Sequence, residues 1–294
     1  MNILISGASG LIGSELTPYL KAQGHSVFVL NRTDKDSPFN WDPSTGHIQL
    51  DSNIELDAVI NLNGVNIGDQ RWSPERKRQI VESRISSTDL LSRTIAKLPN
   101  PPKVFLSASA IGFYGDTGRH SVDEKSPVGD NFLSQIVDPW EQAASPAQAA
   151  GIRTVFMRSG VVITPEGGAL KKMLLPFKLG LGGKVGSGQQ YMSWISLSDE
   201  LRAIEFLLNN NISGPVNLTS PTPVSNQDFT KALGHALNRP TIFPMPEFIV
   251  KALFGEMGDL LLLGSNRVLP SVLLEKGFNF NHNFIDDAFR FKQL

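Results

Sequence analysis

The sequence predicts an α/β fold built around a doubly wound parallel sheet. Short apolar runs alternate with helical patterns from residue 2 to residue 163. Strand–helix–strand units in this rhythm are typical of parallel strands joined by right-handed crossovers. The chain has 294 residues, 40% of them hydrophobic and 19% charged, which suffices for one large α/β unit or about two domains.

Each element follows from a local pattern. The run 2–6 predicts the first strand, 11–24 the helix after it, and 25–30 the second strand. Ser73 is a suitable N-cap for a long helix, with a proline at the first helical position. The other strands expected in this part are 56–64, 103–110 and 153–163, and the other helices are 73–98 and 138–151.

Beyond residue 164 the sequence changes in character. Residues 178–190 are rich in glycine and predict an irregular segment over a cleft. A helix is expected at 194–210 and a strand at 214–220, and short helices joined by proline-containing turns follow from residue 221. We expect these segments to form a C-terminal lobe on the carboxyl ends of the strands.

Three glycines at the end of the first strand predict a dinucleotide site. In a strand–turn–helix context of the Rossmann type, the first permits the tight turn, the second lets backbone approach a pyrophosphate, and the third allows close packing of helix on sheet. The free N–H groups and positive dipole end of the following helix would face the same anion. The residues expected on the cofactor here are Gly7, Ser9, Gly10, Leu11, Ile12 and Gly13.

The second strand ends in Asn31 and Arg32, where an NAD-preferring site usually has Asp or Glu. A carboxylate would repel a 2′-phosphate, whereas a guanidinium binds it through charge-assisted hydrogen bonds. We therefore predict NADP(H) as the cofactor, bound in part by these two residues. The alternative is that Arg32 is a surface arginine beside Asp34 and Asp36.

Composition argues against several other functions. The net charge of −1 lacks the basic excess of a nucleic-acid-binding protein. With no cysteine and five isolated histidines, no zinc site is expected. No apolar run is long enough to span a bilayer and no signal-peptide pattern is present, so we expect a cytoplasmic protein without a membrane partner. The sequence does not determine the oligomeric state.

The chain resembles the extended short-chain dehydrogenase/reductase family, in its sugar-nucleotide-epimerase-like branch. The glycine spacing, NLNG at 61–64 and SASAIGFYGD at 107–116 match that branch. Longer strings, among them GDQRWSPERKRQIVESR at 68–84 and RVLPSVLLEKGF at 267–278, resemble an epimerase-like subgroup with a C-terminal domain of unknown function.

The resemblance implies a Rossmann-type domain that binds NADP(H) and a smaller, interleaved α+β C-terminal domain. Residues 1–164, with 192–220 returning to them, would form the first domain, and residues 165–191 with 221–294 the second, substrate-binding one. The resemblance also implies further contacts with the dinucleotide, from Leu62, Asn63, Gly64 and Arg84.

Catalysis in this family needs a tyrosine followed four residues later by a lysine. The cation lowers the pKa of a phenol that otherwise titrates near about 10. Four residues after the three tyrosines of this chain come Gln23, Gly118 and Ile195, so the pair is missing. If Glu141 is taken as the acidic landmark of this helix, the position of the family's tyrosine corresponds to Leu133 and that of its lysine to Val137.

Five residues are candidates for the remaining chemistry. Ser109, at the carboxyl edge of the sheet, would hydrogen-bond the substrate or cap local backbone. Tyr114 would replace the missing acid or line the cofactor pocket. Arg158 would pair with an anionic substrate group or form a structural ion pair. Gln190 and Trp194 are expected to line the substrate cleft.

These features predict an NADP(H)-dependent epimerase or oxidoreductase for a small polar substrate, with sugar nucleotides among the candidates. The alternative is a catalytically silent NADP(H)-binding regulatory module, favoured by the apolar Leu133 and Val137. A third hypothesis is a structural protein that the cofactor stabilises.

Overall fold

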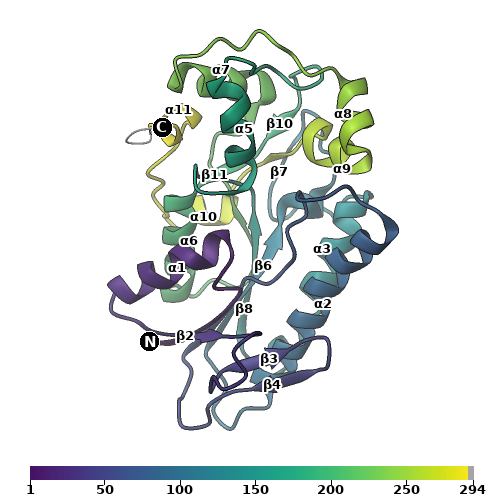
Figure 1. The fold of residues 1–294 in the computed structure, drawn as a ribbon. Coiled ribbons are helices and arrows are strands. Elements are labelled where there is room, and N and C mark those ends of the chain that lie inside the picture. The colour runs from purple at the N-terminus through teal and green to yellow at the C-terminus, as the bar shows by residue number, and fades with distance from the viewer. Residues whose placement is uncertain (291–294) are drawn as a thin grey trace.

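A six-stranded parallel sheet organises the computed structural model, which describes residues 1–290 (Figure 1). Its strand order is β12-β8-β6-β5-β1-β2, and all neighbours are parallel. The chain starts in β1, adds β2 on one side and then crosses to β5 on the other, so the predicted doubly wound sheet is confirmed. The strands are β1 (Asn2–Ser6), β2 (Ser26–Leu30), β5 (Ala58–Asn61), β6 (Val104–Ala110), β8 (Arg153–Ser159) and β12 (Gly214–Leu218).

Helices cover both faces of the sheet because its strands are apolar on both sides. Ile3 and Ile5 pack in one core with Leu16 of α1 and Ile204 of α6, whereas Leu4 packs on the opposite face in a core with Leu91 of α2. In Figure 1, α1 and α6 accordingly lie on one side of the strands and α2 and α3 on the other. These helices are α1 (Leu11–Ala22), α2 (Pro74–Ala96), α3 (Phe132–Gln142), α4 (Ser145–Ala149) and α6 (Leu197–Asn209).

The remaining elements form a lobe at the top of the view in Figure 1, together with short pieces beside the sheet. A third core, which includes Trp194 and Phe229, holds α5, β11 and α7 together. The lobe helices are α5 (Gly168–Lys178), α7 (Asn226–Ala236), α8 (Glu247–Phe254), α9 (Glu256–Gly258), the π-helix η2 (Asp259–Leu263) and α11 (Ile285–Ala288). Helix α10 (Ser271–Glu275) packs beside β12 of the sheet instead. The short strands are β3 (Asn40–Asp42), β4 (His47–Gln49), β7 (Ser121–Val122), β9 (Val161–Ile163), β10 (Tyr191–Met192), β11 (Trp194–Ser196), β13 (Val224–Ser225) and β14 (Arg267–Val268), and the 3₁₀-helix η1 is Ile111–Tyr114.

Three elements differ from the sequence-based expectation for local reasons. The helix expected at 138–151 begins earlier, because Asn131 caps α3 by accepting the N–H groups of Leu133 and Ser134, and it is interrupted before α4. The expected strand 153–163 divides at Gly160 into β8 and β9. The segment 194–210 opens as strand β11 before α6 begins.

The segments assigned to the two expected domains are interlaced. Strand β12 comes after residues 165–191 of the second expected domain. It is nevertheless an edge strand of the sheet and pairs with β8. Leu273 and Phe278, far along the chain, are buried in the sheet core with α1 and α6. The division into 1–164 with 192–220, and 165–191 with 221–294, stays a prediction.

Candidate functional site

The turn after β1 has the shape that its glycines predict. Gly7 has a φ of +77°, and a Cβ built on it would lie 2.6 Å from the carbonyl oxygen of Leu62. A Cβ on Gly13 would lie 2.3 Å from the carbonyl oxygen of Gly7. Ser9 and Gly10 are exposed, and the N-terminus of α1 has neither a side-chain cap nor an acidic residue in its first turn. Its first N–H groups are therefore open to an anion from outside.

A buried set of hydrogen bonds holds the loop after β5 against this turn. Asn63 Nδ2 donates to Ser6 Oγ at 2.6 Å and to Asn61 Oδ1 at 2.7 Å. Asn61 Nδ2 in turn donates to Thr88 Oγ1 on α2 at 2.8 Å. Leu62 and Asn63 thus lie beside Gly7, and Gly64 follows them in the chain. This is the point where the strand order reverses, which is where open α/β sheets bind ligands.

Arg32 is exposed at the end of β2. In the described part of the chain it forms no ion pair, and neither Asp34 nor Asp36 neutralises it. Asn31 is fixed locally, since its Nδ2 donates to the carbonyl of Val29 and to Ser37 Oγ. The guanidinium of Arg32 remains available to a phosphate.

Arg84 lies against the loop after β5. Its guanidinium donates to the carbonyl oxygens of Ile80 and Val65, both at 3.1 Å, and its Cζ lies 3.1 Å from a Cβ built on Gly64. Burial and then the charge of Arg76 lower the pKa of Arg84 to about 10. No carboxylate within residues 1–290 pairs with it, so its contact with the dinucleotide stays a prediction.

The carboxyl edge of β6 and β8 carries a closed polar network. Ser109 Oγ donates to Glu141 Oε1 at 2.5 Å, and Arg158 binds both oxygens of Glu141 at 2.7 and 2.8 Å. Arg158 Nη1 donates to the hydroxyl of Tyr114 at 3.0 Å, and that hydroxyl donates to Asn217 Oδ1 at 2.7 Å. All five side chains are buried. Of the two alternatives for Arg158, the structure shows the ion pair.

Glu141 and Asn217 are the members of this network that the sequence did not identify. Leu133, Val137 and Trp140 form the apolar stripe of α3, and Glu141 continues it toward the core. A carboxylate at such a position is a signal for a buried partner, because an unpaired charge there is costly. Asn217 lies on β12 and carries no comparable signal.

The network leaves Ser109 and Tyr114 few free hydrogen-bonding groups. The hydroxyl hydrogens of both are donated within the protein. Burial raises the pKa of Tyr114 to about 12, in spite of the nearby Arg158 charge. A phenol with that pKa exchanges protons poorly near neutrality. The predicted catalytic roles of Ser109 and Tyr114 stay predictions.

The positions where a tyrosine and a lysine would lie are filled with apolar contacts. A Cβ built on Gly112 would lie 3.1 Å from Leu133 Cβ and 3.7 Å from Val137 Cγ2, so α3 packs directly on η1. Both side chains are buried. No proton relay of the usual kind is possible through them.

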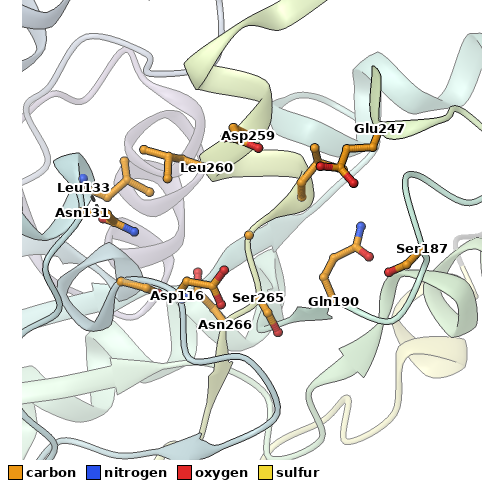
Figure 2. Close-up of a pocket in the computed structure, with 13 residues that line it drawn as sticks. Asp116, Asn131, Leu133, Ser187, Gln190, Glu247, Asp259, Leu260, Ser265 and Asn266 are labelled. Carbon is orange, nitrogen blue, oxygen red and sulfur yellow. Dashed lines mark hydrogen bonds between the residues drawn. The ribbon is translucent and has the colours of Figure 1, made fainter. Parts of the chain in front are cut away.

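A cavity of about 270 Å³ lies between this edge and the lobe (Figure 2). Leu133 borders it, so it adjoins the expected tyrosine position. Gln190 lines it, and its contact with a substrate stays a prediction. The expectation that Trp194 lines a cleft was wrong. Trp194 is fully buried in the lobe core, and its Nε1 donates to the carbonyl of Thr222 at 3.0 Å. The cavity residues are Gly115, Asp116, Asn131, Leu133, Ser187, Gln190, Glu247, Asp259, Leu260, Leu263, Gly264, Ser265 and Asn266.

Residues 1–290 contain neither a cluster of metal-binding side chains nor a helix that could cross a membrane. No three carboxylate or imidazole side chains there come close enough together to hold a metal ion. In the same range, none of the helices has both the length and the apolar character needed to cross a bilayer.

Comparison with known proteins places the chain in a family. Residues 3–218 match the NAD dependent epimerase/dehydratase family, and residues 245–291 match a domain of unknown function, DUF1731. The chain belongs to the NAD-dependent epimerase/dehydratase family. It is 46% identical over 289 residues to an epimerase family protein of Mycobacterium bovis, covering 97% of this chain and 95% of that protein. It is 35% identical over 285 residues to the human epimerase family protein SDR39U1, covering 96% of each.

Solved structures agree with this assignment. The crystal structure of human SDR39U1 isoform 2 with NADPH has a TM-score of 0.91 and 34% identity, covering 98% of both chains. A nucleoside-diphosphate sugar epimerase from Corynebacterium glutamicum has a TM-score of 0.79 and 32% identity, covering 98% of this chain and 57% of that one. A Thermus thermophilus UDP-glucose 4-epimerase, at a TM-score of 0.74 and 17% identity, shares the fold.

Proposed function

We propose that this family member binds NADP(H) and uses it to oxidise, reduce or epimerise a small polar substrate in the cavity beside Leu133. One observation carries the proposal: the glycine turn and the uncapped N-terminus of α1 lie at the strand-order reversal of a sheet whose carboxyl edge also borders the cavity. A bound nicotinamide would supply a carbon that donates or accepts hydride.

The residues present fit a dinucleotide phosphate. A side chain at Gly7 or Gly13 would collide with neighbouring backbone, so glycine at these positions permits the tight turn. The exposed Ser9 and Gly10 leave the turn open to a pyrophosphate. Arg32, without an ion-pair partner in the described structure, would bind the 2′-phosphate. The human relative that was crystallised with NADPH supports the same cofactor.

The proton would move by a route other than the usual tyrosine. Ser109 and Tyr114 are bonded within the buried network, which supports a positioning role for them at this edge. The titratable groups that face the cavity are Asp116, Glu247 and Asp259. A proton exchanged at a bound hydroxyl or carbonyl would pass to one of these carboxylates or to solvent.

Calorimetry and a turnover screen test the proposal together. NADPH should bind the purified protein more tightly than NADH, because only NADPH carries the phosphate that Arg32 would meet. The protein loaded with NADPH or NADP+ should then convert at least one member of a panel of small hydroxy-carbonyl compounds. A reduction consumes NADPH, an oxidation forms NADPH from NADP+, and an epimerisation forms the epimer with no net change in cofactor. Absence of NADPH binding at millimolar ligand would refute the proposal.

A catalytically silent regulatory module is the second candidate, supported by the apolar packing of Leu133 and Val137 on Gly112. Under it, wild-type protein turns over nothing, and Leu133→Tyr combined with Val137→Lys creates hydride transfer in the NADPH-loaded protein. The matched control is Leu133→Phe, which adds an aromatic ring without the hydroxyl. Turnover by the wild type excludes this candidate.

A further inference from the structure

We infer that the cavity takes an uncharged or positively charged polyhydroxy compound of about the size of a monosaccharide, rather than a sugar nucleotide. The inference rests on the proposed function and deepens it by naming the substrate class. Three independent properties of the cavity carry it, namely its charge, the polarity of its free atoms and its volume.

The charge of the lining is negative. Asp116, Glu247 and Asp259 contribute three carboxylates, and no Lys, Arg or His is among the lining residues. Lys251, outside the lining, binds Glu247 Oε1 at 2.7 Å and approaches Asp259 Oδ1 at 3.5 Å. Lys184, also outside the lining, donates from its Nζ to the carbonyl of the lining residue Ser187 at 3.2 Å. Three carboxylates against these two ammonium groups leave one negative charge. Phosphate groups are normally held by Arg or Lys, and a diphosphate placed here would meet like charge instead.

The free polar atoms are mainly hydrogen-bond acceptors. Gln190 is 8% exposed, and its Nε2 donates to the carbonyls of Val185 and Leu262, at 3.0 and 2.9 Å. Its Oε1 has no protein partner among the described residues. Asn266 likewise uses its Nδ2 on the carbonyl of Gly115, which leaves its Oδ1.

These two amides and the three carboxylates surround the space in Figure 2. Asn131 supplies a contrasting group, because its Oδ1 caps α3 and its Nδ2 forms no hydrogen bond within residues 1–290. A ligand that satisfies this lining has to bring donors, as hydroxyl or ammonium groups do.

The volume agrees with a small ligand. Sites for larger ligands have volumes of about 300–1,000 Å³. A single sugar ring is of the size of this space, whereas the nucleotide part of a sugar nucleotide would have to lie outside it.

Ligand-observed NMR on the NADPH-loaded protein tests the inference. Saturation transfer is measured with glucosamine, glucose, glucose 1-phosphate and UDP-glucose at equal millimolar concentrations. Glucosamine and glucose should bind, and the two phosphorylated compounds should bind at least about tenfold more weakly, because about 1.4 kcal/mol of like-charge repulsion gives that factor. Equal or tighter binding of either phosphorylated compound, or binding of none of the four, overturns the inference. NADPH binding is measured separately by calorimetry, so failure of the proposed function is distinguishable.

Neutralising the lining should reverse the selectivity. Asp116→Asn combined with Asp259→Asn should weaken glucosamine binding several-fold and strengthen glucose 1-phosphate binding, with NADPH affinity and the melting temperature unchanged. Glu15→Gln with Glu82→Gln, both at exposed positions on α1 and α2, gives the same change in net charge and should leave the selectivity as in the wild type. Unchanged selectivity in the cavity variant contradicts the inference.

Discussion

The carboxyl edge of the sheet is constructed in two opposite ways. At β1 and β2, the turn keeps N–H groups of α1 uncapped and Arg32 without an ion-pair partner among residues 1–290. At β6 and β8, buried polar side chains bond to one another, and Arg158 is neutralised by Glu141. The first region leaves charge to be satisfied by a ligand, whereas the second satisfies its own. We therefore expect substitutions at the first to change binding and substitutions at the second to change stability.

The largest effect should come from breaking the buried ion pair. Arg158→Met leaves Glu141 as a buried charge without its cation and should lower the free energy of unfolding by about 3–5 kcal/mol. Urea denaturation measures this loss. NADPH affinity, measured under native conditions, should remain within a few-fold of the wild type.

A double variant sharpens this result. Arg158→Met together with Glu141→Gln removes both charges and should recover part of the lost stability, since no buried ion then remains unpaired. If Arg158→Met instead abolishes NADPH binding while leaving stability intact, the contrast between the two regions is wrong.

At the end of β8, the buried carboxyl group of Glu200 is only partly hydrogen-bonded. Ser159 Oγ donates to its Oε1 at 2.6 Å, its Oε2 has no protein partner in the described structure, and the side chain is fully buried. Burial raises the pKa of Glu200 from 4.5 to about 7. Between pH 4.5 and about 7, Glu200 is therefore neutral in the folded state and ionised in the unfolded state.

The contribution of Glu200 to the free energy of unfolding should accordingly be fully present below pH 4.5. It should fall as the pH rises toward 7, with a total loss of about 3 kcal/mol. Glu200→Gln should remove the loss, so the variant is more stable than the wild type at pH 8 and similar to it at pH 4.5. Melting curves across this pH range measure the difference. Glu82→Gln, at an exposed position, is the control, and parallel curves for Glu200→Gln and the wild type would contradict the prediction.

The smallest effect should be at the open region. Arg32→Ala should weaken NADPH binding by about 1.5–3 kcal/mol, the contribution of a hydrogen bond to a charged group, and leave NADH binding nearly unchanged. The control is Lys97→Ala, which removes a positive charge at an exposed position at the end of α2. Calorimetry with both cofactors gives the comparison. Equal losses for the two cofactors would show that Arg32 does not contact the 2′-phosphate.

The two regions also differ in how far the sequence predicts them. The glycine turn depends on neighbours such as Gly7 and Gly13, so its geometry could be inferred from local spacing. The network joins Ser109, Glu141, Arg158 and Asn217, which come together only when the sheet forms, and pairing over such separations leaves no local pattern.

The cavity was predictable only in part. Gln190 was inferred from a glycine-rich segment, but Trp194 was misplaced because the break at Ser193 between β10 and β11 could not be inferred from residue types. Asp116 and Glu247 lie more than a hundred residues apart in the chain, and neither belongs to a recognisable motif.

The burial of Leu273 and Phe278 under the sheet has a practical consequence for dissecting the molecule. A shortened chain that stops after β12 would keep every strand of the sheet, yet it would expose to water the apolar face that these two residues cover. The sheet therefore cannot be isolated by this truncation, and heat should melt the sheet and the C-terminal segment in one transition.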